Sequence, residues 1–193
     1  MKKRLVVGLT GSFGSGKTTV SKIFKRLGAK KIISADQVAR EAFSPNRECF
    51  RKIKSLFGNK KLSRREIAKA VFSDPKKRRA LERIIHPYVY RRISAEIRKM
   101  KQGIMIVEVP LLFEAKFDRL CDVTVTVSAG TSNRKRLLRL GFSPNEIKAR
   151  IKAQLPEPEK IKRADFIINN IGTRKSLYKR TKFVWQQLKS ELN

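Results

Sequence analysis

Short apolar runs alternate along the chain with longer segments in which apolar residues recur at helical spacing. The apolar runs occupy residues 5–10, 32–33, 104–109, 123–127 and 166–168. Such runs typically become buried strands, and the helical segments between them become the crossover connections of a parallel sheet. The pattern therefore predicts an α/β fold with a five-stranded parallel sheet.

Several helical segments carry signals for where they begin and end. Ser63 and Ser143 each stand three residues before a glutamate, which is the capping-box spacing, and Asp74 before a proline suits a helix start. Gly28 is a typical stop for the first helical segment. The segment from residue 173 onward predicts a closing amphipathic helix. Its core-facing residues are expected to be Leu177, Tyr178, Thr181, Val184, Trp185 and Leu188.

The stretch between the second and third apolar runs is basic and helical in pattern. Leu81, Ile84 and Ile85 predict one apolar helix face within it. We expect that helix to break at His86 and Pro87, because proline lacks the amide that a helix interior needs.

One segment matches the pattern G-x-x-x-x-G-K-[ST] directly after the first predicted strand and before the first predicted helix. Its residues are Gly11, Ser12, Phe13, Gly14, Ser15, Gly16, Lys17 and Thr18, and Thr19 continues it. The glycines let backbone amides turn toward phosphate groups, and the following helix directs its N-terminal dipole at the same anion. Lys17 can reach the β- and γ-phosphates, and the Thr18 hydroxyl can bind Mg²⁺. The segment is therefore predicted to be a phosphate loop (P-loop) that binds a nucleoside triphosphate.

The composition narrows the class of protein. The 193 residues suit one compact domain, and no apolar run approaches the ~20 residues that a membrane span needs. Cys49 and Cys121 lack metal-binding spacing and suggest free thiols, so we expect a cytoplasmic protein. The net charge of +31 favours polyanionic partners. A solvated basic surface without a dedicated partner explains most of these charges equally well.

Among proteins with a P-loop, a small kinase fits this chain best. The N-K-x-D motif by which GTPases read guanine does not occur, and the strand end at Glu108 matches that of motors and helicases only weakly. A small kinase needs an acid near the acceptor hydroxyl, a helical acceptor region and a basic lid. Asp36, residues 40–101 and residues 131–163 are the respective candidates.

Two of these candidates have simpler explanations that the sequence leaves open. Asp36 follows the second predicted strand, at the sheet edge where ligands bind in open α/β folds, but it also suits the N-cap of a helix. Arg134, Arg136 and Arg139 lie where a lid would be expected, but they also suit a solvated helix face.

These motifs, in this order, resemble those of the dephospho-CoA kinase family, from about residue 7 to residue 172. The P-loop is preceded by Gly8, Leu9 and Thr10, as in that family. The segment EVPLLFE, residues 108–114, is the most specific mark after the loop. The other matching residues are Ala35, Asp36, Ala39, Arg40, His86, Pro87, Arg139, Arg150, Gln154, Ala164, Asp165, Asn170 and Gly172.

The resemblance implies a three-layer P-loop fold in a single domain, residues 1–193, with a helical acceptor-binding insertion and a helical lid. It implies that Asp36 accepts the proton of the ribose hydroxyl or orients that hydroxyl. Lys17 and Arg139 would stabilise charge on the transferring phosphoryl group.

The resemblance also implies the substrates. ATP with Mg²⁺ would phosphorylate the ribose 3′-hydroxyl of dephospho-CoA, the last step of coenzyme A biosynthesis. His86, Leu111 and Leu112 would line the acceptor site, although a lone histidine before proline is as often a packing residue. No specific nucleic-acid partner is expected.

Three positions depart from the family's usual pattern. Ser34 replaces the first acid of Asp-Ala-Asp, which puts a metal or water role of that acid in doubt. Leu140 replaces an aspartate that could position Arg139. Ser12 replaces a glycine of the loop, which is tolerated if its φ is negative.

Two rival functions remain open from the sequence. Another nucleoside or nucleotide kinase would share the P-loop and differ in its acceptor. A nucleic-acid-binding ATPase is suggested by the net charge alone, and the basic stretches show no interleaved aromatic pattern.

Overall fold

A five-stranded, all-parallel sheet forms the centre of the structure, a computed structural model that describes residues 3–45, 47–58, 63–130 and 132–192. The order of the described strands is β2-β3-β1-β4-β5. Their bounds are β1 (Arg4–Gly11), β2 (Lys31–Ser34), β3 (Gly103–Glu108), β4 (Val123–Ser128) and β5 (Phe166–Asn169). The predicted α/β class and five-stranded parallel sheet are confirmed.

The helices lie between and after the strands in sequence. They are α1 (Lys17–Leu27), α2 (Ala35–Glu41), α3 (Glu48–Leu56), α4 (Arg64–Ser73), α5 (Pro75–Lys99), η1 (Phe117–Leu120), α6 (Ser132–Arg139), α7 (Pro144–Lys152), α8 (Glu157–Arg163) and α9 (Arg174–Ser190). The described chain divides into two compact units, one formed by residues 1–34 with 96–193 and the other by residues 35–95. The sheet belongs to the first unit, which we call the sheet unit, and α2, α3 and α4 belong to the second, the helical unit.

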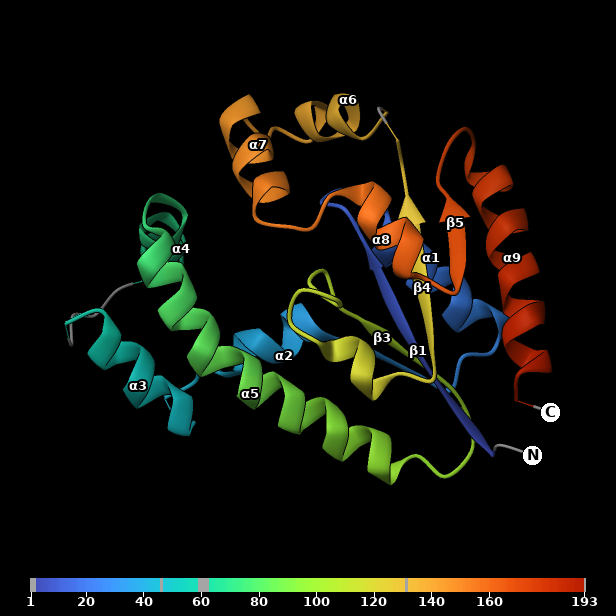
Figure 1. Cartoon of the computed structure of the whole chain (residues 1–193), viewed down its shortest axis with the longest axis horizontal. Helices are drawn as coiled ribbons and strands as arrows, with labels where there is room; N and C mark the ends of the chain where they lie inside the picture. The colour runs from blue at the N-terminus through green and yellow to red at the C-terminus, as the bar shows by residue number, and fades with distance from the viewer. Residues whose placement is uncertain (1–2, 46, 59–62, 131, 193) are drawn as a thin grey trace. The chain divides into compact units, whose positions relative to one another are not determined.

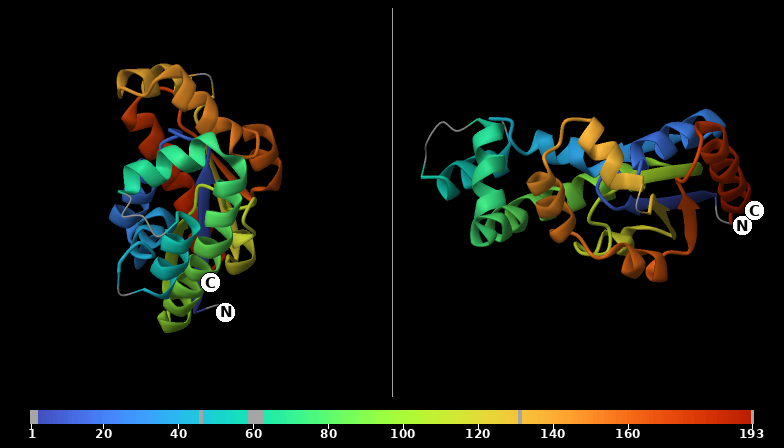
Figure 2. Two further views of the ribbon diagram at one scale, coloured as in Figure 1. Left: turned by 90° about the vertical axis from the view of Figure 1, so that its left-hand side faces the viewer. Right: turned by 90° about the horizontal axis from the view of Figure 1, so that it is seen from above.

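Helices cover both faces of the sheet. Helices α1 and α9 pack against each other, α1 contacts β3 and β1, and α9 contacts β5. Helix α8 contacts β4 and β1, and η1 contacts β1. Figure 1 labels these elements, and the right-hand view of Figure 2 shows α1 and α8 on opposite sides of the strands. The layered arrangement puts both faces of the central strands out of water.

The core explains why the strand sequences are almost continuously apolar. Val7, Leu9 and Val125 are fully buried in one cluster that also includes residues of α1 and α9. The rings of Phe24 and Trp185 lie 5.9 Å apart, centroid to centroid, where α1 meets α9. Parallel strands buried on both faces have no polar side to alternate with, so they appear in the sequence as unbroken apolar runs.

The predicted helix starts are confirmed. The Ser63 and Ser143 side chains accept hydrogen bonds from the amides of Glu66 and Glu146, and both glutamates complete capping boxes. Asp74 Oδ1 accepts hydrogen bonds from the amides of residues 76 and 77, 2.8 and 3.2 Å away, at the start of α5. These signals are local, so they hold whatever the helix packs against.

Two details of the helix predictions are wrong. Helix α5 does not break at His86 but continues through Pro87 to Lys99. A proline removes one intrahelical hydrogen bond, and a helix with many other turns tolerates that loss. Tyr178 in α9 does not face the core; it is 42% exposed, whereas its predicted partners along the helix are buried.

The structure bears on two expectations drawn from the composition, which concern the cysteines and membrane-spanning helices. Cys49 and Cys121 are unpaired. Burial raises the pKa of the Cys121 thiol to about 12, with Asp118 and Asp122 contributing further. Among the described helices, none combines the length and apolar character that crossing a membrane requires.

Candidate active site

The P-loop joins the end of β1 to the start of α1 and depends on glycine at two positions. Gly14 and Gly16 have φ angles of 75° and 97°, in the left-handed region that other residues rarely adopt. A Cβ atom at Gly16 would lie 2.2 Å from the Asn170 side-chain nitrogen. Ser12 is absent from the described positive-φ residues, so the condition for replacing a glycine there is met.

Side chains from distant segments hold the loop in place. Asn170 Nδ2, just after β5, donates to the Ser15 carbonyl at 2.7 Å. Asn133 Nδ2, in α6, donates to the carbonyl of Phe13. The Ser15 hydroxyl is fully buried and has no hydrogen-bond partner among the described residues. A buried, unpartnered hydroxyl beside a glycine-formed cradle suits a site that receives a polar ligand.

Lys17 lies where the loop becomes α1, and its side chain is directed back over the loop. Its ammonium donates to the carbonyls of Gly11 and Ser12 at 2.9 and 3.0 Å, and the residue is only 9% exposed. Helix α1 begins at this residue, so its N-terminal dipole is directed at the loop as well. The local positive potential therefore lies where the sequence placed the phosphates.

The Thr18 hydroxyl is held by a buried acid. It donates to Glu108 Oε1 at 2.8 Å, and the Ser21 hydroxyl donates to Glu108 Oε2 at 3.0 Å. Glu108 is the last residue of β3 and is 8% exposed. Hydroxyl and carboxylate oxygens are the hard ligands that Mg²⁺ prefers, so this pair of residues fits that ion.

The predicted lid is attached to the loop through Phe13. The Phe13 and Phe142 rings meet edge to face, 5.1 Å apart, and the Arg150 guanidinium lies over both rings at 4.8 and 5.2 Å. The Phe13 amide donates to Gln154 Oε1 at 2.8 Å. Arg150 and Gln154, which the family resemblance included without a role, thus connect α7 and its C-terminal end to the P-loop.

The arginines of α6 differ in their positions. Arg139 is exposed, at the C-terminal end of the helix, and the neighbouring Leu140 is 67% exposed. Arg136 lies closer to the loop, because its Nη1 atom would be 3.5 Å from a Cβ at Gly16. The Arg134 side chain lies outside the described part of the structure. Arg136 is thus an alternative to Arg139 for contacting a phosphate.

The segment that includes Leu111 and Leu112 leaves the sheet directly after β3. The Val109 amide still donates to the Leu9 carbonyl, at 2.9 Å, which extends the sheet contact by one residue. Leu112 is fully buried, close to Gly8, whereas Leu111 is partly exposed. Leu111 is therefore the one of the pair that is accessible at the surface of the sheet unit.

Asp36 and His86 both belong to the helical unit. Helix α2 begins at Ala35, directly after β2, so Asp36 lies inside the first helical turn and not at the N-cap position. His86 lies in the interior of α5. Burial lowers the pKa of its imidazole below the ordinary value of 6.5, and Glu82 opposes that shift. The neutral ring is thus favoured near pH 7.

The structure places beside the P-loop several residues that were not among the site residues predicted from the sequence. They are Glu108, Ser21 and Phe142, and Arg136 was named only as a member of the predicted lid. Glu108 carried a usable signal, an acid that ends a buried apolar strand next to a P-loop strand. Phe142 and Arg136 become neighbours of the loop only through long-range folding, whereas Ser21 belongs to the helix that continues the loop.

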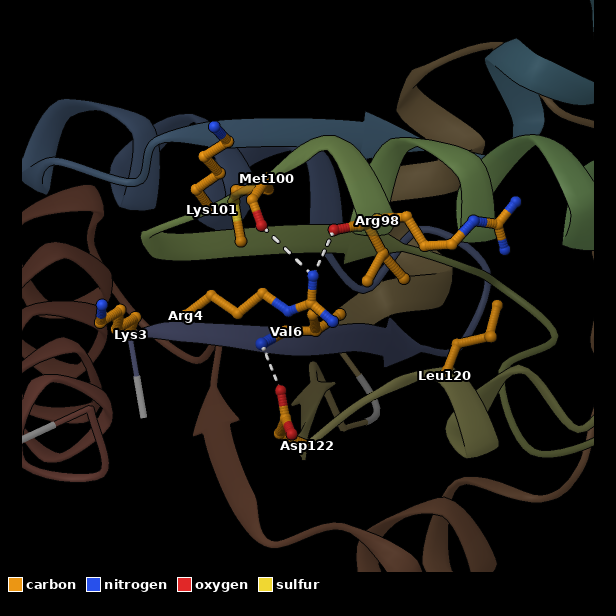
Figure 3. Close-up of a pocket in the computed structure, with 9 residues that line it drawn as sticks. Lys3, Arg4, Val6, Arg98, Met100, Lys101, Leu120 and Asp122 are labelled. Atoms are coloured by element: carbon orange, nitrogen blue, oxygen red, sulfur yellow. Dashed lines mark hydrogen bonds between the residues drawn. The ribbon is translucent and has the colours of Figure 1, made fainter. Parts of the chain in front are cut away.

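A separate hollow of about 530 Å³ lies at the opposite, amino-terminal edge of the sheet. Figure 3 shows its lining residues, which come from the start of β1, the end of α5 and the connection from η1 to β4. None of the predicted site residues lines it, so the hollow and the P-loop are distinct places in the sheet unit.

The fold and the P-loop define the class. A glycine-formed phosphate cradle, a lysine over it and a Thr–Glu pair beside it, at the carboxyl edge of a parallel sheet, are the features of a P-loop kinase. The comparisons with known proteins give the particular family.

The family model for dephospho-CoA kinase matches residues 5–176. The dephospho-CoA kinase of Thermus thermophilus is 34% identical over 191 residues, covering 97% of this chain and 93% of that protein. The dephospho-CoA kinase of Carboxydothermus hydrogenoformans is 38% identical over 179 residues, covering 87% of this chain and 86% of that protein. The chain therefore belongs to the dephospho-CoA kinase family.

Solved structures agree with this assignment. A crystal structure from Thermus thermophilus aligns with a TM-score of 0.81 at 34% identity, covering 97% of this chain and 99% of that one. A dephospho-CoA kinase from Campylobacter jejuni aligns with a TM-score of 0.70 at 27% identity. A shikimate kinase from Acinetobacter baumannii, at 12% identity and a TM-score of 0.58, shares the fold alone.

Proposed function

We propose that this chain transfers the γ-phosphate of ATP to the ribose 3′-hydroxyl of dephospho-CoA, giving coenzyme A and ADP. The observation that carries the proposal is the extent of the similarity, 97% of this chain against the Thermus thermophilus dephospho-CoA kinase. A P-loop alone is compatible with many acceptors, whereas similarity across residues 40–101 includes the region expected to bind the acceptor.

The chain's own residues would act mainly by position and charge. The P-loop amides and the Lys17 ammonium would bind the phosphates, and the arginines of α6 would neutralise charge on the transferring group. Asp36 would orient the acceptor hydroxyl and take its proton. Leu111 and His86 would contact the acceptor, with Leu112 as buried support beneath Leu111.

Mg²⁺ would be held by the Thr18 hydroxyl, with Glu108 behind it. The bound ion would supply neutralisation of the β- and γ-phosphate oxygens. Glu108 is suited to fix the orientation of Thr18, because its carboxylate accepts hydrogen bonds from both Thr18 and Ser21.

The surroundings of the enzyme are also part of the proposal. We place it in the cytoplasm, where unpaired cysteines such as Cys49 and Cys121 are the usual state. The basic surface, with a net charge of +31, would attract polyanions without sequence preference.

The experiment that tests the function is a comparison of acceptors. Purified protein with Mg-ATP is assayed for ADP release with dephospho-CoA, AMP, adenosine, pantothenate and shikimate, and the product is tested with a CoA-dependent enzyme. We expect turnover with dephospho-CoA and a product that the coupling enzyme accepts. Turnover with a different acceptor alone would refute the named substrate and leave the kinase class intact.

A further inference from the structure

A fully buried lysine lies beneath the loop that follows β3. Lys160, in α8, is 0% exposed. Its ammonium donates to the Pro110 carbonyl at 2.7 Å and pairs with Glu114 Oε1 at 2.9 Å. Lysine is among the residues least often buried completely, and a buried charge requires close partners. A fully buried ammonium therefore needs an explanation beyond solubility or surface charge.

The two partners of Lys160 stand at the two ends of one short loop. Pro110 precedes Leu111 and Leu112, and Glu114 follows them, so one cation holds both ends of the segment that includes these leucines. The Pro110 carbonyl also accepts a hydrogen bond from the Thr10 hydroxyl at 3.3 Å, at the end of β1. The loop is thereby tied to the carboxyl edge of the sheet.

Lys160 is itself fixed to the sheet, and its partner Glu114 reaches the end of the lid region. The Thr126 hydroxyl, in β4, donates to the Lys160 carbonyl at 3.1 Å. The oxygen Glu114 Oε1 that pairs with the ammonium also accepts a hydrogen bond from the Leu155 amide at 2.8 Å. Leu155 lies between α7 and α8, inside the predicted lid and directly before α8, which packs against β4 and β1; we call this point the returning end of the lid.

We propose that the Lys160–Glu114 pair is a positioning device that couples the loop of residues 110–114 to the returning end of the lid. A displacement of Leu155 would move Glu114, and the shared ammonium would transmit the displacement to the Pro110 end of the loop. Neither residue contacts the reacting atoms in this proposal, which rests on the proposed function only in naming the acceptor that Leu111 meets.

A stability role alone makes a different prediction. Replacing a buried ion pair with apolar residues of similar volume is commonly neutral or stabilising, whereas removing one partner leaves an uncompensated charge. A pair that serves only to stabilise the fold is therefore replaceable as a pair. A pair that positions the loop is not, because apolar side chains cannot hold the Pro110 carbonyl and the Leu155 amide together.

The test compares Lys160→Met, the double variant Lys160→Met/Glu114→Leu and the unaltered enzyme. The control is Lys31→Met, which removes another Lys–Glu pair of the sheet unit, with Glu96; Lys31 lies at the start of β2, whereas the loop follows the end of β3. Thermal midpoints, KM for the acceptor, KM for ATP and kcat are measured for each protein. If Lys160→Met fails to fold, the double variant alone supplies the comparison.

We expect the double variant to keep its thermal midpoint while KM for the acceptor rises about tenfold or more, since small displacements of positioning groups have effects of that size. KM for ATP and the Lys31→Met control should stay within about twofold of the unaltered enzyme. Normal acceptor KM in a stable double variant, or an equal rise in both KM values, would overturn the proposal.

A readout without acceptor separates this inference from the proposed function. Amide hydrogen exchange in peptides that cover residues 110–114 and Leu155 should accelerate together in Lys160→Met, which keeps Glu114 as the acceptor of the Leu155 amide, while exchange in the P-loop peptide stays unchanged. Acceleration in only one of the two peptides would refute the coupling. That result would stand even if the substrate panel identified a different acceptor.

Discussion

The two edges of the same parallel sheet use charged residues in opposite ways. At the amino edge, the Arg4 guanidinium donates to the carbonyls of Ile97 and Met100 at 2.9 and 3.3 Å, and Asp122 accepts a hydrogen bond from the Val6 amide at 2.8 Å. Figure 3 shows these bonds between residues that line the hollow. At the carboxyl edge, the P-loop region contains Lys17, the N-terminus of α1 and the Ser15 hydroxyl. That hydroxyl has no hydrogen-bond partner among the described residues.

The comparison shows that a hollow in the surface, such as the one at the amino edge, is not by itself a functional site. The amino-edge hollow is lined by basic residues, but the central one, Arg4, has its hydrogen bonds directed at the end of α5, where a cation favourably meets the helix dipole. The carboxyl edge has a glycine backbone that lets a ligand approach closely. Chemistry is therefore expected at the carboxyl edge, where the glycine backbone and the Ser15 hydroxyl can receive a ligand, and stability at the amino edge, where Arg4 binds the carbonyls at the end of α5.

The largest expected effect is at the carboxyl edge. Lys17→Ala should lower kcat/KM by about a thousandfold, because it removes the positive charge nearest the transferring phosphoryl group. The measurement is steady-state ADP release. Lys22→Ala, on an exposed turn of the same helix, is the matched control and should stay close to normal. Equal losses in both variants would contradict a specific role for Lys17.

Asp36→Asn should lower kcat by roughly a hundredfold or more while KM for ATP changes little, since a general base contributes on that scale. Both constants come from the same ADP-release assay. Glu41→Gln, in the same helix and paired with Arg92, controls for a general effect on α2. Near-normal turnover by Asp36→Asn would remove this residue from the proton-accepting role.

Glu108→Gln should weaken the apparent affinity for Mg²⁺ by about tenfold to a hundredfold, because residues behind a metal ligand have effects of that size. The measurement is activity against Mg²⁺ concentration at fixed ATP. Ser21→Ala, which removes the other hydrogen bond to Glu108, should have a smaller effect. An unchanged Mg²⁺ dependence in Glu108→Gln would contradict the assignment.

Arg4→Gln, at the amino edge, should have the opposite effect to the carboxyl-edge variants, because it should lower stability and leave activity unchanged. We expect the free energy of unfolding to fall by about 1 kcal/mol, the scale of hydrogen bonds lost at a partly exposed group, and kcat and KM to stay normal. Urea denaturation gives the first quantity and the ADP assay the others. A clear loss of activity in the folded variant would mean that the amino edge takes part in function.

The smallest expected effect concerns acid stability at the amino edge. Hydrogen bonds from Lys31 and Lys99 lower the pKa of Glu96 from 4.5 to about 2. Its contribution to stability is therefore complete above pH 4.5 and is lost as the pH falls toward 2. Unfolding measured between those values should be slightly less pH-dependent in Glu96→Gln. An identical profile would show that the pair contributes nothing measurable.

Sequence reasoning recovered the parts of the site that are contiguous in the chain. The P-loop was identifiable because its glycines, lysine and threonine must follow one another between a strand and a helix. Glu108 was visible only as a weak match to a strand end. Its significance depends on a hydrogen bond to Thr18 across 90 positions of sequence, which no local pattern encodes.

The family resemblance supplied candidate site residues that differ in the structure in their exposure and in their distance from the P-loop. Leu111 is accessible, whereas Leu112 is fully buried. Arg139 is exposed, and the P-loop has Arg136 nearby instead. Arg136 and Arg139 lie three residues apart, on one side of α6 and about 4.5 Å apart along its axis, so they differ in their distance from the loop.

By itself, the sequence determined the elements, their order and the phosphate-binding chemistry. Apolar runs, capping-box spacing and the glycine loop are patterns within a few neighbouring residues, so they are visible in the sequence before any packing is known. The tertiary structure decided which distant groups meet. Gln154 reaches the Phe13 amide across 141 positions, and Lys160 reaches Pro110 across 50. Such contacts depend on how the elements pack, so only the folded chain brings the lid, the loop and the buried pair together.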